Sequence, residues 1–302
     1  MGSSVTAGNV AGVVGTPHFG RATFLMCPPQ FYDVDYVINP WMAGNVHRSS
    51  RDLAFVQWRA LHAEMQRVAE VKLVQPVMGS PDMVFTANAG LVMHGVVAMA
   101  SFFHKQRQGE EKYFRAWFES QGFILWETSR ATPFEGEGDA LFDADGARLW
   151  AGHGVRTCRT SHRHVADAWH TRVTSLHLVD PRFYHLDTCF APLTGGYVMY
   201  YPGAFDAASV GAIEAAYPVE KRIVVGEKDA VRFCCNAVNV GDVVIVNCVS
   251  AELRSRLEGC GFEVREVELS EFLKGGGAAK CLVLRLSDLE VTHKGRLTVE
   301  KR

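Results

Sequence analysis

The chain has 302 residues, of which 48% are apolar and 21% charged, and 31 Lys and Arg against 33 Asp and Glu give a formal net charge of −2. This composition is typical of a folded globular protein and not of a disordered chain. Because there is no basic excess to neutralise a phosphate backbone, nucleic acid is excluded as the expected partner.

No apolar run reaches the roughly 20 residues that span a bilayer, so no membrane association is expected. Residues 1–20 lack the basic start and long apolar core of a signal peptide, and we interpret them as a mobile leader before a single domain over residues 21–302. The eight cysteines match neither a disulfide framework nor a zinc site, which favours a reduced, cytoplasmic protein. We expect no metal and no organic cofactor.

Hydrophobic periodicity predicts helices and strands in a repeating order. After a first strand at residues 23–26, the pattern predicts a helix at 51–69, a strand at 71–74, an apolar segment at 83–93, a helix at 111–121 and a strand at 123–126. Next come a hairpin at 139–150, a helix at 164–173, a strand at 175–179 and a hairpin at 184–200. The chain ends with a helix at 207–216, a strand at 222–225, a hairpin at 235–248, a helix at 251–258, a strand at 262–267 and a last segment at 278–286.

These elements repeat as a hairpin, a helix and a strand. If the first strand joins the last segment, five ββαβ units close a ring around a central channel, an α/β propeller with pseudo-fivefold symmetry, and stacking buries the apolar face of each unit. Alternating strands and helices also permit a doubly wound parallel sheet. The hairpins weigh against that sheet, because each requires antiparallel pairing.

Three segments carry candidate chemistry. Glu135 lies between Phe134 and Gly136 on a tight turn before a strand, where its carboxylate either faces the channel and binds a cation or is simply solvated. His185 and Asp187 are two residues apart, so in a strand they share one face and form either an acid–base pair or a satisfied core histidine. Cys281 follows a flexible run of three glycines, which makes it the best nucleophile candidate among the eight cysteines.

Two asparagines interrupt apolar stretches. Asn39 lies in Tyr36 to Trp41, and Asn88 lies in Phe85 to Gly90. A buried carboxamide must be hydrogen-bonded, so each asparagine either contacts a ligand or caps a turn.

Taken in order, these residues resemble the guanidine-modifying (pentein) superfamily. Leu25 to Pro29, Tyr32 to Met42 and Phe85 to Gly90 are most similar to its arginine dihydrolase branch, near the dimethylarginine dimethylaminohydrolase-like amidinotransferases. The resemblance implies hydrolysis at the guanidinium carbon of arginine, giving citrulline and/or ornithine. Arginine deiminases usually carry Asp where this chain has Asn88, and an Asn there implies that citrulline is processed too. On this resemblance we expect the extra C-terminal domain of some long dihydrolases to be missing here.

The resemblance also assigns roles. Cys281 would attack as a thiolate and His185 would move protons, while Glu135 holds the guanidinium and Asp187 does the same or orients His185. Asn39 and Asn88 would bind the substrate, and Arg107 and Arg156 match positions that bind its α-carboxylate.

Other readings stay open. The same chemistry on dimethylarginine would give citrulline and dimethylamine, amidinotransfer would need an amine acceptor, and a catalytically silent pentein would only bind. The expected partner is a small guanidino substrate, and a homo-oligomer is left open.

Overall fold

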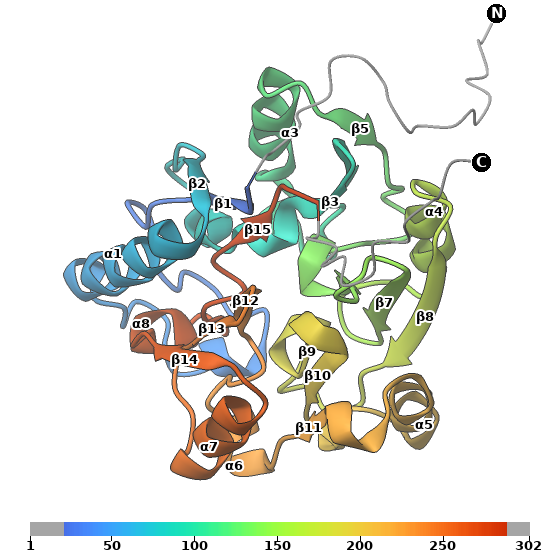
Figure 1. The fold of residues 1–302 in the computed structure, drawn as a ribbon. Coiled ribbons are helices and arrows are strands. Elements are labelled where there is room, and N and C mark those ends of the chain that lie inside the picture. Colours follow the sequence, from blue (N-terminus) through green and yellow to red (C-terminus); the bar gives the residue numbers. More distant parts are fainter. Residues whose placement is uncertain (1–20, 289–302) are drawn as a thin grey trace, which may run out of the picture.

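A computed structural model describes residues 21–288, and over these residues the chain forms three-stranded sheets arranged in a ring (Figure 1). In each of the five sheets the middle strand pairs antiparallel with one neighbour and parallel with the other. A parallel pair needs a crossover, which a helix supplies on the outside of the ring. The expected α/β propeller is therefore confirmed, and the doubly wound sheet is wrong. The expected leader, residues 1–20, lies outside the described residues.

Four units follow one another along the chain, each with a hairpin, a helix and a third strand. The first two are β3 (Gly90–Met93), β4 (Val96–Met99), α2 (Lys105–Gln108), α3 (Glu111–Ser120) and β5 (Ile124–Trp126), then β6 (Ala140–Phe142), β7 (Arg148–His153), α4 (Ser161–Asp167) and β8 (Arg172–His177). The next two are β9 (Phe190–Leu193), β10 (Tyr197–Tyr200), α5 (Ala207–Ala216) and β11 (Arg222–Val224), then α6 (Glu227–Ala230), β12 (Val238–Val240), β13 (Val243–Val246), α7 (Ala251–Gly259) and β14 (Glu263–Glu266).

The remaining unit closes the ring with both ends of the described chain. Strand β15 (Leu284–Arg285), which follows the short helix α8 (Ser270–Leu273), pairs antiparallel with β1 (Thr23–Met26). Helix α1 (Arg51–Val68) then returns the chain so that β2 (Glu70–Leu73) pairs parallel with β1. Segments more than 200 residues apart in sequence thus share one sheet, as expected from the sequence.

Helix α1 shows how sequence sets these elements. The Ser50 side chain accepts a hydrogen bond from the Leu53 N–H and caps the helix start. Leu61 and Met65, four residues apart, are buried on one face. The helix ends where Ala69 turns to an extended conformation, which starts β2.

The predicted helix at 164–173 is the clearest error. Helix α4 ends at Asp167 and strand β8 begins at Arg172. Between them His170 takes a positive φ of 50°, a left-handed conformation that stops a helix, and the Thr171 N–H bonds back to the Ala166 carbonyl. The predicted helices at 51–69, 111–121, 207–216 and 251–258 are confirmed to within one residue at each end.

Within residues 21–288, no helix combines the length and apolarity needed to cross a bilayer. All eight cysteines lie in this range, and each is a free thiol.

One hydroxyl helps to join the closing unit to the next. Thr86, fully buried in the 3₁₀ turn Thr86–Ala89 before β3, lies 2.9 Å from the Leu25 carbonyl and 3.0 Å from the Leu282 carbonyl. Its single O–H proton is therefore shared between buried backbone acceptors on β1 and in the segment before β15.

We predict that Thr86→Val lowers the free energy of unfolding by about 1–3 kcal/mol, because it removes the hydroxyl donor from these buried carbonyls at nearly unchanged volume. Urea unfolding followed by circular dichroism measures this. Thr86→Ser, which keeps the hydroxyl, should lose less than Thr86→Val. Equal stability of Thr86→Val and the parent chain would contradict the role given to the hydroxyl.

Candidate active site

The turns before the first strands of the units place a polar side chain at equivalent positions. In four units an aromatic residue precedes the polar one by three positions, and in the closing unit Ala278 takes the aromatic place. Neighbouring turns contact one another, Thr86–Ala89 against Gly136–Gly138 and Gly136–Gly138 against Leu186–Thr188. The ring thereby gathers buried polar residues that are far apart in sequence: Asn88, Glu137, Asp187, Asn236 and Cys281.

Cys281 lies between a carboxylate and an amide. Its Sγ donates to Asp187 Oδ2 at 3.3 Å and accepts from Asn236 Nδ2 at 3.1 Å. Burial, with the nearby Asp187, raises the pKa of the thiol well above its ordinary value. Burial also raises the pKa of Asp187 to about 7, although Lys280 acts in the opposite direction. Both groups are therefore harder to ionise than in water, and a nearby positive charge would favour their ionisation.

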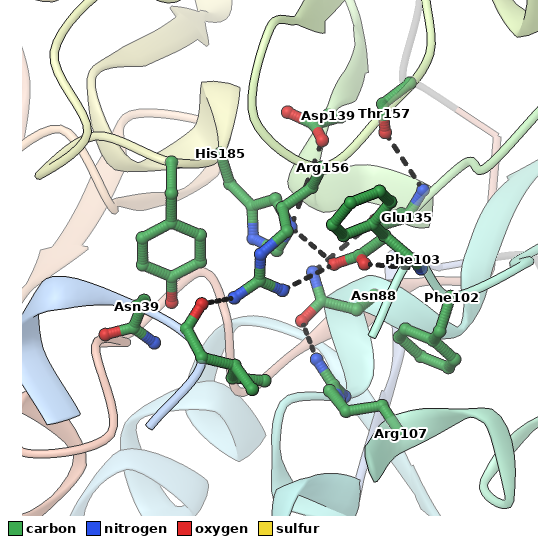
Figure 2. A network of polar contacts seen from close by, with 12 residues as sticks. Asn39, Asn88, Phe102, Phe103, Arg107, Glu135, Asp139, Arg156, Thr157 and His185 are labelled. Atoms are coloured by element: carbon green, nitrogen blue, oxygen red, sulfur yellow. Dashed lines mark hydrogen bonds and ion pairs between the residues drawn. The ribbon is translucent and has the colours of Figure 1, made fainter. Parts of the chain in front are cut away.

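His185 faces carboxylates from the turn before β6 (Figure 2). Its Nε2 lies 2.7 Å from Glu135 Oε2 and 3.9 Å from Asp139 Oδ2. The same Glu135 oxygen is 3.0 Å from Arg156 Nη1, and Oε1 accepts from the Phe103 N–H. Although burial opposes it, Arg156 and the hydrogen bond from His185 hold the pKa of Glu135 well below its usual range. Glu135 is thus a permanent anion that orients the imidazole.

The expected pairing of His185 with Asp187 is wrong in its geometry. Residues Leu186–Thr188 form a 3₁₀ turn and not a strand, so the two side chains do not share a strand face. Asp187 contacts Cys281, whereas Glu135 contacts the imidazole. His185 and Asp187, at the start of and within one short turn, therefore contact different partners.

Asn88 is oriented by a buried arginine. Arg107 Nη1 donates to Asn88 Oδ1 at 2.7 Å, and Arg107 is itself paired with Glu110 at 2.8 Å. The Asn88 Nδ2 then points to the other side, 3.5 Å from the Glu135 carbonyl (Figure 2). The cation fixes the acceptor end of the amide and leaves its donor end directed at the site.

Gly138 lets the Asn88 amide and the His185 imidazole lie close to its backbone, because it has no side chain. A Cβ at this position would lie 2.3 Å from Asn88 Nδ2 and 3.1 Å from His185 Nδ1. The amide donor and the free imidazole nitrogen therefore both border the Gly138 backbone, and any larger residue would displace them. Within the described residues, His185 Nδ1 has no hydrogen-bond partner.

Arg156 and Asn39 come from the loops that follow β7 and β1. The Arg156 guanidinium donates to the Ile38 carbonyl at 2.9 Å and lies 4.7 Å from the centre of the Tyr184 ring. Asn39 Oδ1 accepts from the Trp41 N–H and caps a short 3₁₀ helix, while Nδ2 donates to the Gly275 carbonyl at 3.0 Å. Asn39 thereby ties the first loop to the glycine run before Cys281.

The family model for eukaryotic N,N-dimethylarginine dimethylhydrolase matches residues 38–287. A dimethylarginine dimethylaminohydrolase of Mycobacterium tuberculosis is 40% identical over 272 residues, which cover 90% of this chain and 87% of that protein. The chain belongs to the dimethylarginine dimethylaminohydrolase-like branch of the pentein superfamily.

Within this branch the chain is also similar to bifunctional arginine dihydrolase/ornithine cyclodeaminases. ArgZ of Synechocystis sp. is 59% identical over 264 residues, which are 87% of this chain but 37% of ArgZ. The chain thus spans little more than a third of that relative. A crystal structure of the ArgZ N-terminal domain, a cysteine-to-serine variant bound to its substrate, matches with a TM-score of 0.88 at 58% identity, covering 88% of this chain and 98% of that one.

Sequence reasoning missed buried polar residues of this pentein centre, among them Asn236 and Asp82. Asn236 contacts Cys281, and the recurring aromatic residue three positions earlier was the signal that could have found it. Asp82 accepts from the Tyr36 hydroxyl at 2.9 Å and lies 3.9 Å from Arg107, while its Oδ1 has no partner among the described residues. Asp82 sits in a Ser-Pro-Asp turn that gives no functional signal.

A cavity of about 510 Å³ is lined mainly by residues of the hairpins, among them Val92, Pro192 and Val240. Glu137 and Lys280, 2.6 Å apart, line it, but Cys281, His185 and Glu135 do not. Glu137 and Lys280 therefore border this cavity, whereas the three proposed catalytic groups do not.

Among residues 21–288, one group has ligand atoms close enough together to hold a metal ion. It consists of Asp33, Asp35 and His47 on the loop after β1, and its members range from half-buried to exposed. The Asp33 carboxylate already bonds to Ser49 and to the Val34 N–H.

The raised pKa of Asp187 predicts a pH-dependent stability. A carboxyl whose folded pKa lies above its unfolded value stabilises the fold at low pH and loses that contribution as pH rises through the folded pKa. For Asp187 this window runs from about pH 4 to about pH 7. Asp187→Asn cannot ionise, so its free energy of unfolding should fall less than that of the parent chain across this window.

Urea unfolding at pH 4, 5.5 and 7.5 tests this expectation. Asp180→Asn serves as the control, because the hydrogen bond from Arg182 lowers the pKa of Asp180 and reverses the sign of its small effect. Parallel pH curves for Asp187→Asn and the parent chain would show that Asp187 ionises in the folded state as it does in the unfolded state.

Proposed function

We propose that this chain is an arginine dihydrolase that converts arginine and two waters to ornithine, carbon dioxide and two ammonia. The observation that carries the proposal is the buried Cys281 thiol, 3.3 Å from the Asp187 carboxyl, in a centre that also contains the His185–Glu135 pair. Such a thiol–carboxyl pair favours a planar cation, because the positive charge offsets the cost of ionising both groups.

In the first round, the Cys281 thiolate attacks the guanidinium carbon. The protonated imidazole of His185 donates its proton to the departing nitrogen, the C–N bond breaks and ammonia leaves. The product is a covalent thiouronium on Cys281. The now neutral His185 takes a proton from water, which adds to the same carbon, and the C–S bond breaks to give citrulline. Glu135 keeps the imidazole oriented throughout.

Asn88 supports a second round. Citrulline carries a neutral ureido group, whose oxygen would be repelled by a carboxylate at position 88. The Asn88 amide, held by Arg107 with its Nδ2 directed at the site, donates to that oxygen instead. In the second round the Cys281 thiolate attacks the ureido carbon, and the C–N bond to the terminal nitrogen breaks so that ammonia leaves. A second water then adds to the same carbon, the C–S bond breaks, and the resulting carbamate decomposes to ornithine and carbon dioxide.

The amino-acid end of the substrate needs a cation and an acceptor. Arg156 and Arg107 supply guanidinium groups for the α-carboxylate. The unpartnered Oδ1 of Asp82, close to Arg107, supplies an acceptor for the α-ammonium. Asn39 contributes by fixing the loop that carries the Ile38 carbonyl to the glycine run.

The relatives support both halves of this proposal. Besides the substrate-bound cysteine variant, an asparagine-to-serine variant of the ArgZ N-terminal domain was solved covalently bound to a reaction intermediate, again with a TM-score of 0.88. These two variants change a cysteine and an asparagine, the residue types to which the proposal gives roles as Cys281 and Asn88.

Dimethylarginine hydrolysis is the second candidate, favoured by the family match and by the Mycobacterium tuberculosis relative. It uses the same thiol chemistry with dimethylamine as the leaving group. Asn88 favours arginine, because a neutral amide serves the citrulline step that dimethylarginine hydrolysis does not need. A silent binding role would give no reason to keep the thiol, the imidazole and the carboxylates together.

We also infer that the chain works in a reducing compartment such as the cytoplasm, because its eight cysteines are free thiols. Its partner is a small guanidino molecule.

Purified chain incubated with arginine should release ornithine and two equivalents of ammonia, with citrulline as the intermediate, measured by amino-acid chromatography. Cys281→Ser should abolish turnover while still binding arginine, because it removes only the nucleophile. Dimethylarginine in a parallel reaction separates the candidates. Faster release of dimethylamine than of ammonia from arginine would overturn the dihydrolase assignment in favour of the second function.

Asn88→Asp should stop the reaction at citrulline, with ornithine formation at least tenfold slower, because the carboxylate repels the ureido oxygen and loses the donor. Time courses of citrulline and ornithine measure this. Asn247→Asp, which makes the same substitution at a buried position outside the site, should leave the product ratio unchanged. Unchanged ornithine formation in Asn88→Asp would remove Asn88 from the second round.

A further inference from the structure

One side chain holds the loop that carries Cys281. Asn236, fully buried in the turn between α6 and β12, accepts hydrogen bonds at Oδ1 from the Ala278 N–H and the Cys281 N–H, each at 3.1 Å. Its own backbone carbonyl accepts from the Lys280 N–H at 3.2 Å. Asn236 therefore fixes both the start of this loop and the nucleophile itself.

The other end of the same amide reaches the reacting atom. Asn236 Nδ2 lies 3.1 Å from Cys281 Sγ and 3.2 Å from the Asp187 backbone carbonyl. The amide therefore uses both its acceptor and its donor end, and it bridges the turn before β9 to the loop before β15. Because Asn236 is fully buried, its side-chain amide cannot form hydrogen bonds with water instead.

The backbone before Asn236 is set by packing. Phe233 has a positive φ of 60°, which is unusual for an aromatic residue, and its ring packs edge-on against Trp41 at 4.8 Å. The Asn236 N–H bonds to the Phe233 carbonyl at 3.1 Å. The turn is therefore fixed by the core before Asn236 makes its contacts with the nucleophile.

We propose that Asn236 is a catalytic residue of this site, whose Nδ2–H group stabilises the Cys281 thiolate while Oδ1 holds the nucleophile loop in place. This inference rests on the proposed function and extends it. When the thiol ionises, the contact with Asp187 changes from a hydrogen bond to repulsion between two anions. The Asn236 donor then becomes a charge-assisted hydrogen bond to sulfur, which is stronger than a neutral one.

Other titratable groups around Cys281 remain in place in the test. They are Asp187 and Tyr184 from the segment before β9, Lys280 next to the nucleophile and Glu137 from the turn before β6.

The test compares Asn236→Asp with Asn247→Asp. Asn236→Asp keeps two acceptors for the Ala278 and Cys281 N–H groups but replaces the donor on sulfur by an oxygen. Asn247 is a matched control in the same unit, since it is buried, donates to a backbone carbonyl and to Cys248 Sγ, and accepts from the Leu269 N–H. Asn247→Asp therefore imposes the same chemical change beside a cysteine that is not the nucleophile.

The primary readout is the rate at which iodoacetamide alkylates Cys281 between pH 6 and 10, followed by mass spectrometry of the peptide that carries it. We expect the midpoint of this profile to move up by at least one pH unit in Asn236→Asp, so that alkylation at neutral pH slows by about tenfold or more. In Asn247→Asp the profile should match that of the parent chain. With arginine, kcat of Asn236→Asp should fall at least tenfold with KM changed less than threefold.

A folded Asn236→Asp, checked by circular dichroism, that alkylates with the parent profile would overturn the proposal. If Asn236→Asp does not fold, Asn236→Ser, which loses the sulfur contact at a smaller volume, provides the same comparison. Because alkylation needs no substrate, a shifted profile together with no turnover of arginine by the parent chain would refute the proposed function and still support the thiolate contact.

Discussion

The site depends on burying a thiol next to carboxylates in a place where water cannot screen their charges. Burial raises the pKa values of Cys281 and Asp187, so both groups are harder to ionise than in water. Glu135 behaves differently, because Arg156 and His185 lie within 3.0 Å of it and keep it ionised. The proposed substrate brings the positive charge that the first pair lacks, which couples binding to activation of the nucleophile.

The propeller makes this arrangement possible. Each unit begins its inner hairpin with a turn, and the ring brings these turns together around one axis (Figure 1). The same backbone position therefore holds Asn88, Asp187, Asn236 and Cys281 in different units, and each has a different task. The pseudo-fivefold symmetry places one side chain of each unit near the axis, and sequence differences between the units make these side chains chemically different. The segments after the second strands add Asn39, Arg107 and Arg156.

Much of the fold could be predicted from the sequence, because local periodicity and turn residues act over a few positions. Helix α5 has the predicted bounds, and the hairpin turns near Gly146 and Gly241 lie where glycine permits a positive φ. The prediction of a helix at 164–173 was wrong because His170 adopts a left-handed conformation. A histidine in the sequence does not predict this conformation. The candidate residues also came from the sequence, but their contacts did not, as the separate partners of His185 and Asp187 show.

The sequence by itself determined the residue types of the site and the order of strands and helices that closes a ring, since both follow from side-chain chemistry and short-range pattern. Only the tertiary structure decided that Asp187 faces the thiol, that Glu135 orients His185 and that Arg107 turns the Asn88 amide. It alone placed Asn236 on the sulfur, 45 residues away in the chain. Such contacts join different units, and no local pattern specifies which side chains meet across a ring axis.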